Sequence, residues 1–430
     1  MAKRIVGKQI TRPSGNPDEG PITFPVAKDL LKVDGIPIRD DEVSFYSREY
    51  PLESIAVEQS ASTKWASEVR IDFSPETEAL YEKFRKDISS DVDWIRSSGE
   101  LSPDAAPSGE DVTEAIRQKA YELGYGEAGF AKFDRRYLYQ SRRAEARSDL
   151  PNAICLALEQ DFAATQEMPG IEAEKAQGDA YLKQVELSKQ LVEFILSLGY
   201  SAQVSGPVWH LGPMIPMFVE AGLGQLGVNG QLLSPKFGSR ARLQIILTNA
   251  KVTHDKPVDY GIYKYCESCQ ICFMRCPGRA LEGQRVWYRG VEKHKLIFKR
   301  CRPVMTRYDG CGVCMKVCPI QKYGMKPVME HYIETGEVLG KGSDNLEGYT
   351  LGDKGYFPPG KLPHFDRDFF DMPLGRVEDR LIEEFKEKLR DGKNGGGAAS
   401  EEDWAELRKT IEASVEEGPK MMDMGMDFDA

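Results

Sequence analysis

The chain lacks any hydrophobic run long enough to cross a membrane. About 18 consecutive apolar residues are needed for a spanning helix, and stretches such as Ile245–Leu247 have the length of buried strands. The first residues, Met1–Lys8, also lack the apolar segment and the twin-arginine pair of an export signal. We therefore expect a soluble, cytoplasmic protein. Disulfides are rare in that compartment, and clustered cysteines more often bind metal there.

Positive charge is scarce as well. The chain has 57 Lys and Arg against 68 Asp and Glu, a net charge of −11. Non-specific nucleic-acid binding depends on an excess of Lys and Arg, so we expect no nucleic-acid partner. The hydrophobic content of 41% and charged content of 29% are ordinary for a folded globular protein.

A regular alternation of helices and strands begins near residue 111. Asp111 offers an N-cap with a glutamate three positions later, which is a signature of a helix start. Hydrophobic periodicity predicts helices at 111–124 and 178–198, and strands at 152–158 and 243–247. Helix–strand alternation of this kind favours an α/β core.

The segments around this core have weaker patterns. Residues 1–75 are rich in prolines and charges and predict an extended arm with short strands, followed by a helix at 76–91. Residues 333–375 are predicted to be irregular. Solvated helices are expected at 378–390 and 401–416, before a Met-rich tail.

Eight of the nine cysteines form two runs of related spacing. The runs are Cys266-x2-Cys269-x2-Cys272-x3-Cys276-Pro and Cys301-x9-Cys311-x2-Cys314-x3-Cys318-Pro. Such spacing wraps a loop around a [4Fe–4S] cubane, and in two-cluster ferredoxins the last cysteine of each run ligates the other cluster. The predicted ligands are therefore Cys266, Cys269, Cys272 and Cys318 for the first cluster, and Cys276, Cys301, Cys311 and Cys314 for the second.

Zinc is the alternative ligand for Cys-x2-Cys pairs. The first run is a complete ferredoxin pattern and the second repeats its ending, so iron–sulfur clusters are favoured over zinc. Cys155 stands alone in an apolar segment and is predicted to be a small buried hydrophobic residue.

A glycine-rich block precedes the cysteines. It carries Gly222, Gly224, Gly227 and Gly230, and such glycines let a backbone approach a flat ligand closely. The block does not match a dinucleotide fingerprint, because no strand immediately precedes it and the spacing differs. A nicotinamide site is therefore not expected.

The glycine-rich block followed by the double cysteine run with its x9 insertion resembles the corrinoid-dependent reductive dehalogenases. It is more distantly similar to the epoxyqueuosine reductases, and the resemblance spans roughly residues 110–325. It implies an α/β (α+β) fold with a nitroreductase-like corrinoid-binding core and a bacterial-ferredoxin-like domain for two [4Fe–4S] clusters. The implied division is an N-terminal arm and substrate-capping region (1–110), a corrinoid-binding core (111–255), a ferredoxin-like domain (256–330) and a C-terminal region with helices covering the core and a flexible tail (331–430).

The resemblance also implies a reaction. Electrons would pass through the two clusters to cobalamin Co(I), which would cleave the carbon–halogen bond of an organohalide. Tyr181, shortly after Gly178, matches the family's proton donor. Lys264, two residues before the first cluster cysteine, matches its supporting cation, which stabilises tyrosinate. Tyr263 and Tyr265 flank Lys264, and either could be the pocket residue instead.

Further residues are expected to contact the corrinoid. The expected contacts are Gly222, Gly224, Gly227, Asn229, Gly230, Arg240 and Arg242. One of the two arginines is expected to pair with corrinoid carboxamides or the nucleotide phosphate, since guanidinium suits bidentate phosphate contacts; a surface salt bridge is the alternative. The five histidines include none in an Asp-x-His-x-x-Gly motif, so the resemblance implies a base-off cobalamin without a His ligand.

The organohalide could be aryl or alkyl. The chain has no appended flavin or plant-type ferredoxin module, so an external low-potential ferredoxin or flavodoxin is the expected electron donor. The first alternative function is an epoxyqueuosine-reductase-like tRNA-modifying enzyme, which the acidic stretch beyond residue 375 does not favour. The second alternative is a non-enzymatic electron carrier.

Overall fold

The structure of the protein is a computed structural model that describes part of the chain. The described residues are 12–13, 21–22, 74–97, 99, 107, 109–138, 145–207, 209–288, 291–366 and 369–370. Within the N-terminal arm these include two short paired strands, β1 (Arg12–Pro13) and β2 (Pro21–Ile22). The helices predicted at 378–390 and 401–416 lie outside the described residues.

A four-stranded antiparallel sheet is the centre of the fold. Its strand order is β3-β4-β8-β5. The strands are β3 (Glu127–Lys132), β4 (Asn152–Glu159), β8 (Ala241–Thr248) and β5 (Ala202–Ser205). Six consecutive residues of β4 are buried, as expected of a central strand covered on both faces. The mixed helix–strand class predicted from the sequence is confirmed, with every pairing in this sheet antiparallel.

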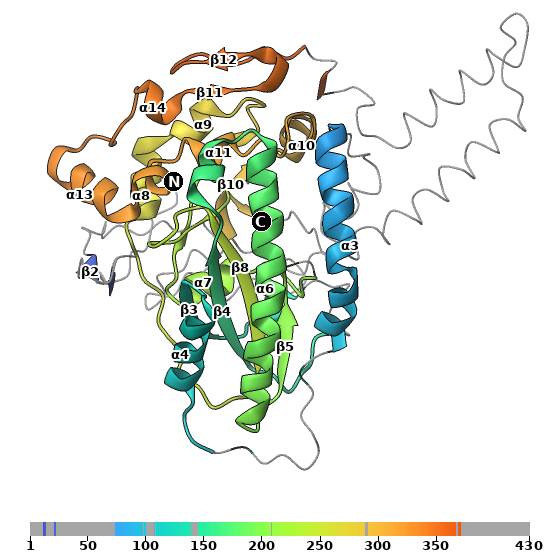
Figure 1. The fold of residues 1–430 in the computed structure, drawn as a ribbon. Coiled ribbons are helices and arrows are strands. Elements are labelled where there is room, and N and C mark those ends of the chain that lie inside the picture. The colour runs from blue at the N-terminus through green and yellow to red at the C-terminus, as the bar shows by residue number, and fades with distance from the viewer. Residues whose placement is uncertain are drawn as a thin grey trace, which may run out of the picture.

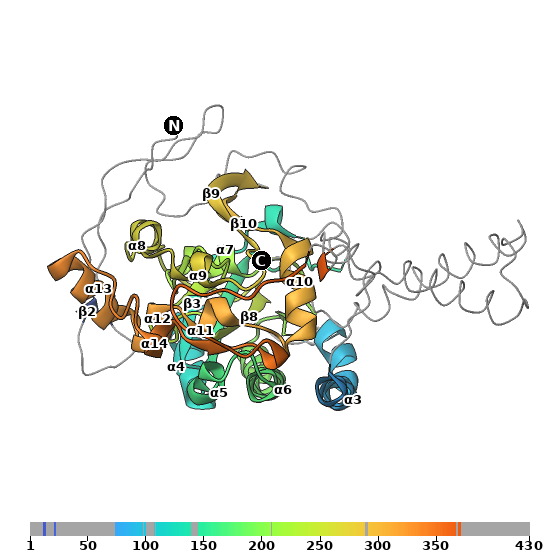
Figure 2. The same cartoon turned by 90° about the horizontal axis from the view of Figure 1, so that it is seen from above.

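Helices cover both faces of this sheet. On one face lie α4 (Thr113–Leu123), α6 (Ile171–Ser197) and α3 (Pro75–Ser97), with α3 alongside α6; α7 (Ile215–Glu220) packs against β3 and β4 from the other face (Figure 2). Buried residues of these helices and of the sheet form one hydrophobic cluster. We call residues 113–248 the core region.

Two predicted helix starts differ from the structure. α6 begins at Ile171, not at Gly178, because the helix continues through this glycine, where Phe84 of α3 packs closely. In α4 the N-cap residue is Val112, one position after the predicted Asp111. The Asp111 side chain still accepts a hydrogen bond from the Thr113 amide at 2.9 Å, so it satisfies one of the open N–H groups of the first turn.

The segment that carries the eight cysteines is made of short helices and one hairpin. The elements are α8 (Ile262–Cys269), α9 (Ile271–Arg275), β9 (Leu281–Tyr288), β10 (Val291–Leu296), α10 (Phe298–Arg307), α11 (Val313–Lys316), α12 (Pro319–Tyr323) and α13 (Met325–Thr335). We call residues 262–335 the cysteine region. It lies above the sheet in Figure 1. The β9–β10 hairpin was not predicted from the sequence.

The residues after α13 wrap back over the cysteine region. They contain α14 (Asp344–Glu347), β11 (Tyr349–Thr350), a short 3-10 turn at Gly352–Lys354 and β12 (Tyr356–Phe357). Arg275, which is 1% exposed, holds this segment by donating to the carbonyls of Glu347 and Phe357 and by stacking on Tyr349. The part of 333–375 predicted to be irregular therefore contains short regular elements.

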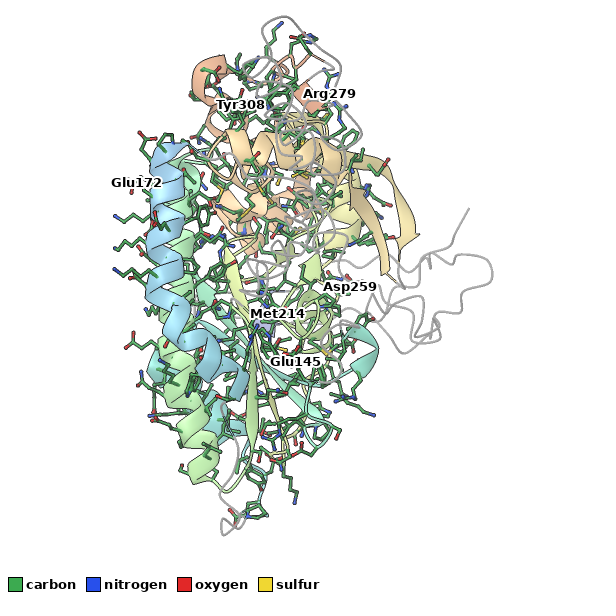
Figure 3. The ribbon with its side chains drawn as sticks, turned by 90° about the vertical axis from the view of Figure 1, so that its right-hand side faces the viewer. Glu145, Glu172, Met214, Asp259, Arg279 and Tyr308 are labelled. Carbon is green, nitrogen blue, oxygen red and sulfur yellow. The ribbon has the colours of Figure 1, made fainter. Side chains whose placement is uncertain are left out.

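Small connecting elements join the two regions. They are a 3-10 turn at Arg135–Tyr137, α5 (Phe162–Gln166), β6 (Gln225–Leu226) and β7 (Leu232–Leu233). Figure 3, a side view, shows Glu172 at the start of α6 toward the end of the molecule that carries Tyr308 and Arg279, with Met214 and Glu145 farther away. No described helix combines the length and apolar character needed to cross a bilayer.

Candidate functional site

The first group of cysteines surrounds a small cavity. Cys266 and Cys269 lie on α8, Cys272 lies on α9 and Cys318 is the N-cap of α12. All four line one cavity of about 20 Å³. The other lining residues are Val228, Asn229, Leu233, Tyr265, Gln270, Pro319 and Ile320. The structure thus brings together the four residues predicted to hold the first cluster.

The thiols of this group also influence one another electrostatically. Burial is the main reason that the pKa of the Cys272 thiol is raised, and the nearby thiolates of Cys266, Cys269 and Cys318 raise it further. Cys318, which belongs to the second run, lines the same cavity as Cys272, and the more distant Cys314 of the second group also raises the pKa of Cys272. The grouping therefore follows the predicted crossing of the two runs.

The second group consists of Cys276, Cys301, Cys311 and Cys314. Burial raises the pKa of the Cys311 thiol most, and the charges of Cys301 and Cys276 add to that rise. The Cys276 sulfur accepts a hydrogen bond from the Ala280 amide at 3.3 Å. Such an N–H donor favours the thiolate form, which is the form that binds metal. The structure therefore brings together the second predicted set as well.

Loop geometry around the cysteines is demanding. Gln270, between Cys269 and Cys272, has φ 55°, and Cys311 has φ 54°. A left-handed backbone is uncommon for residues other than glycine. Two such residues within the cysteine runs show that the backbone turns sharply beside Cys269 and at Cys311.

The donor chemistry of both groups fits iron–sulfur clusters. Each group offers four thiolates, and a four-iron cubane takes one thiolate at each corner. The thiolates of a cubane therefore do not converge on one ion. Within the described residues no three or more His, Cys, Asp or Glu side chains converge to hold a single metal ion.

The glycine-rich block lies against the first cysteine group. Val228 and Leu233 belong to the same buried cluster as Cys266 and Cys269. Asn229 lines the first cavity, its amide donates to the Cys314 carbonyl at 3.4 Å, and its oxygen accepts from the Gln231 amide. Asn229 thus lies between the two cysteine groups.

At two positions of the block, close contacts with neighbouring atoms of the protein require a glycine. A Cβ at Gly224, which has φ 153°, would lie 2.6 Å from the Leu233 carbonyl oxygen across the β6–β7 pair. A Cβ at Gly227 would lie 2.8 Å from the Asn229 side-chain oxygen. Contacts within the protein therefore explain Gly224 and Gly227. From the sequence, these glycines were expected to contact a flat ligand.

Tyr181 and Arg242 meet at the edge of the core. Arg242 lies near the start of β8, where it is paired with Leu158 of β4. Tyr181 lies on α6, which packs over this end of the two strands. The Arg242 guanidinium is 3.4 Å from the Tyr181 hydroxyl oxygen and 5.7 Å from the centre of its ring. Sequence analysis named both residues but assigned Arg242 to the corrinoid.

Gln160 holds this arginine in position. It follows the last residue of β4 and is fully buried. Its side-chain oxygen accepts from Arg242 Nε at 2.7 Å, and its amide nitrogen donates to the Ala173 carbonyl at 3.3 Å. A buried amide anchored on both sides limits the rotamers of the guanidinium. Sequence reasoning missed Gln160, although its place directly after a buried strand was a usable signal.

Lys264 is not brought to Tyr181. It lies on the exposed side of α8, and Figures 1 and 2 both show α8 apart from α6. The cation beside Tyr181 is Arg242 instead. Of the two tyrosines that flank Lys264, Tyr265 lines the first cysteine cavity.

Arg240 joins the two regions of the molecule. It pairs with Glu159 of β4 at 2.8 Å and donates to the carbonyl of Gln321 in α12 at 3.2 Å. Its guanidinium also stacks 5.0 Å from the Phe162 ring. The structure thus gives Arg240 several protein partners.

A second cavity, of about 40 Å³, lies between α3 and α6 beside Tyr181. α3 contributes Tyr81 and Phe84, and the Phe84 ring centre is 6.3 Å from that of Tyr181. Tyr81 donates a hydrogen bond to the buried Glu174 of α6. Ser74 and Thr77, at the start of α3, donate to Asp309 of the cysteine region at 2.9 and 2.7 Å.

Comparison with known proteins supports the resemblance inferred from the motifs. No family model matches the chain. The tetrachloroethene reductive dehalogenase of Dehalobacter restrictus is 32% identical over 185 residues, which cover 40% of this chain and 33% of that protein. The epoxyqueuosine reductase of Lactococcus garvieae is 32% identical over 146 residues, or 32% of this chain and 39% of that protein.

Among solved structures, a reductive dehalogenase described as performing B12-dependent dehalogenation matches with a TM-score of 0.56 at 20% identity. That match covers 74% of this chain and 52% of the other. The chain spans about a third of the length of the curated dehalogenase that it matches. The predicted resemblance to reductive dehalogenases, with epoxyqueuosine reductase as a further relative, is thereby confirmed, and the curated dehalogenase relatives are oxidoreductases.

Proposed function

We propose that this chain, related as it is to reductive dehalogenases, catalyses the reductive dehalogenation of an organohalide. The overall change is R–X + 2 e⁻ + H⁺ → R–H + X⁻, so the carbon–halogen bond breaks and a carbon–hydrogen bond forms. The protein must deliver two electrons and one proton to the same carbon. We assign the proton to the Tyr181 hydroxyl and the electron relay to the two cysteine groups.

The observation that carries this proposal is the coexistence of two devices in one fold. One device is a phenol held beside a guanidinium next to a cavity. The other is a pair of four-thiolate groups packed against the same core. The likeness to reductive dehalogenases in sequence and fold supports reading the two together.

A corrinoid, when bound, supplies low-valent cobalt as the reductant of the carbon–halogen bond. Three buried polar atoms near the boundary between the two regions are the proposed partners of its carboxamides, although Gln166 Nε2 also donates to Gln321 Oε1 at 3.0 Å. They are Gln166 Oε1, Gln321 Nε2 and Ser239 Oγ, and none has a hydrogen-bond partner among the described residues. Buried polar atoms are normally paired, and a ring of carboxamides offers both donors and acceptors.

Two [4Fe–4S] clusters, bound by the two cysteine groups, would supply one-electron carriers. The groups are adjacent, because the charge of Cys314 from the second group acts on Cys272 of the first. Asn229, which bonds to the Cys314 carbonyl and lines the first cavity, spans the gap between them. An external low-potential ferredoxin or flavodoxin is the proposed source of electrons.

Tyr181 is the proposed general acid. Proton donation leaves a phenolate, and a fixed positive charge nearby stabilises that product. Arg242 meets the requirement, since its guanidinium lies 3.4 Å from the Tyr181 hydroxyl oxygen. Its Nε donates a hydrogen bond to the Gln160 side-chain oxygen at 2.7 Å. Arg242 therefore replaces Lys264 as the supporting cation in this proposal.

The α3 helix is the proposed wall of the substrate pocket. It contributes Tyr81 and Phe84 to the cavity beside Tyr181, and aromatic side chains suit an organohalide. Charged side chains, among them Lys83 and Asp87 of α3, line the same cavity. The role agrees with the substrate-capping function expected for residues 1–110.

The deciding experiment uses Tyr181→Phe in protein loaded with iron, sulfide and cobalamin. We expect halide release, driven by a low-potential artificial reductant, to fall by about 100- to 10,000-fold, the usual contribution of a positioned acid. Iron and corrinoid contents should equal those of the unchanged protein, because Tyr181 holds neither cysteine group.

Tyr200→Phe is the matched control. It removes another hydroxyl from the core region, one that donates to the Glu110 carbonyl at 3.3 Å, far along the chain from Arg242. Its rate should stay near that of the unchanged protein. Full halide release by Tyr181→Phe would refute the assigned acid. Failure of the unchanged protein to release halide, together with reduction of epoxyqueuosine in tRNA, would refute the proposed function.

A further inference from the structure

The Tyr265 hydroxyl is buried without an oxygen or nitrogen partner. The side chain is 1% exposed, and its hydroxyl oxygen has no hydrogen-bond partner among the described residues. Tyr265 also lines the cavity that the first four cysteines surround. A buried O–H that is left unpaired costs free energy, and the cavity that Tyr265 lines is where an acceptor would be bound.

The surroundings hold the ring in this orientation. The Tyr265 ring packs edge-on against Tyr332 of α13 with ring centres 5.3 Å apart. Tyr332 is itself held, since its hydroxyl lies 2.7 Å from that of Ser268 on α8. Figures 1 and 2 show α8 and α13 as neighbours. The phenol therefore cannot turn to solvent without unpacking two helices.

Sulfur atoms are the acceptors that this cavity offers, because Cys266, Cys269, Cys272 and Cys318 line it together with Tyr265. Cys269 is one helical turn from Tyr265 on the same helix, so the two side chains share a face of α8.

We propose that Tyr265 donates a hydrogen bond to a sulfur of the first cluster and thereby raises that cluster's reduction potential. The inference rests on the proposed clusters and deepens the proposed function by assigning a residue that tunes the electron relay. Reduction adds negative charge to the cluster and its sulfurs. An O–H dipole aimed at a sulfur stabilises that charge, and hydrogen bonds to sulfur are among the features that set cluster potentials.

Tyr349 provides a contrast within the same molecule. Its hydroxyl is also buried without a partner among the described residues, and the side chain is 1% exposed. The cysteines that act on it are Cys311 and Cys276 of the second group. It is therefore a second buried phenol near cysteines that does not line the first cavity.

The test is Tyr265→Phe in the full chain with both clusters reconstituted. Redox titration followed by electron paramagnetic resonance should give one midpoint potential more negative than in the unchanged protein and one that is unaltered. Iron content should stay the same. Tyr349→Phe removes a comparable buried hydroxyl. The midpoint potential that shifts in Tyr265→Phe should be unchanged in Tyr349→Phe.

A second variant tests the same inference without removing the hydroxyl. Site-specific 3-fluorotyrosine at position 265 keeps the ring and its packing but makes the phenol a stronger donor, so the same midpoint should move in the positive direction. An unchanged midpoint in both variants, with iron bound, would overturn the role of Tyr265 and leave the proposed clusters standing. Absence of iron from the unchanged protein would instead overturn the clusters, and the inference with them.

Discussion

The core region and the cysteine region satisfy their buried polar groups in different ways. In the core, Tyr125 donates to Gln244 at 2.6 Å, and Gln244 donates in turn to the Gly206 carbonyl. In the cysteine region, buried thiols face one another and the phenols of Tyr265 and Tyr349 have no described partner. The core region thus pairs these central groups with its own atoms, and the buried core atoms without a described partner include Gln166 Oε1 and Ser239 Oγ. With the proposed clusters bound, the folding free energy of the cysteine region would include the free energy of cluster binding.

Removal of iron should have the largest effect on this contrast. We expect a chelator to abolish hydrogen-exchange protection in α8, α11 and α12, because burying thiolates beside one another without a cluster is unfavourable. Protection in β4 and β8 should persist, since that sheet is closed by its own backbone pairs. Exchange followed by mass spectrometry measures both at once.

The ninth cysteine serves as a control for that experiment. Cys155 is fully buried in β4, as the sequence predicted. Cys155→Ala should keep the full iron content, whereas Cys318→Ala should lose iron from the first cluster. Equal loss of protection in the sheet and in α8 after chelation would remove the distinction between the two regions.

Variants of Arg242 and Arg240, near the start of β8, should have smaller effects than removal of iron. Arg242 is proposed to serve the reaction, and Arg240 links the two regions. Arg242→Gln removes the charge beside Tyr181 and should slow halide release about 10- to 100-fold, the equivalent of about 1.5–3 kcal/mol for a charged hydrogen bond. Arg242→Lys keeps a charge and should lose less. Steady-state rates at saturating reductant measure both.

Arg240→Gln is the companion variant. It breaks the links to Glu159 and to the Gln321 carbonyl that join core and cysteine regions. Thermal stability should fall, while the rate should fall less than in Arg242→Gln. The reverse order of rates would show that Arg240, not Arg242, serves the reaction.

The smallest expected effect concerns the link between α3 and the cysteine region. Asp309→Ala removes the acceptor for Ser74 and Thr77, and loss of partly buried hydrogen bonds costs about 1 kcal/mol. α3 should exchange its amide protons faster, while α6 is unaffected. Unchanged exchange in α3 would mean that packing on α6 alone holds this helix.

Local patterns predicted much of the fold, and long-range pairing explains what they missed. The helices at 113–123 and 171–197 and the strands at 152–159 and 241–248 followed from periodicity. The predicted helix start at Gly178 was too late, because glycine lowers helix propensity, whereas α6 continues through this glycine in contact with Phe84 of α3. A contact between two helices so far apart in sequence leaves no local signal.

The site was predictable to a similar degree. The spacing of the cysteines predicted two sets, and the structure assembles the same eight residues in two groups. The Tyr181–Arg242 pair depends on the register of β4 against β8 and on the placement of α6 over that edge. Register over that separation is a tertiary property. The sequence therefore led to Lys264, two residues before Cys266, as the cation beside Tyr181, in place of Arg242.

The strand order of the sheet also determines when the sheet can form during synthesis on the ribosome. β4 pairs with β8, so the sheet cannot close until Thr248 has been translated. The first cluster cysteine, Cys266, follows soon after, and the helices that bury it come later still. Because domains tend to fold as units from the N-terminal side, the nascent chain presents its thiols on a finished sheet before α13 covers them. The proposed clusters would then be inserted while the cysteines lie on the folded sheet and before α13 has covered them.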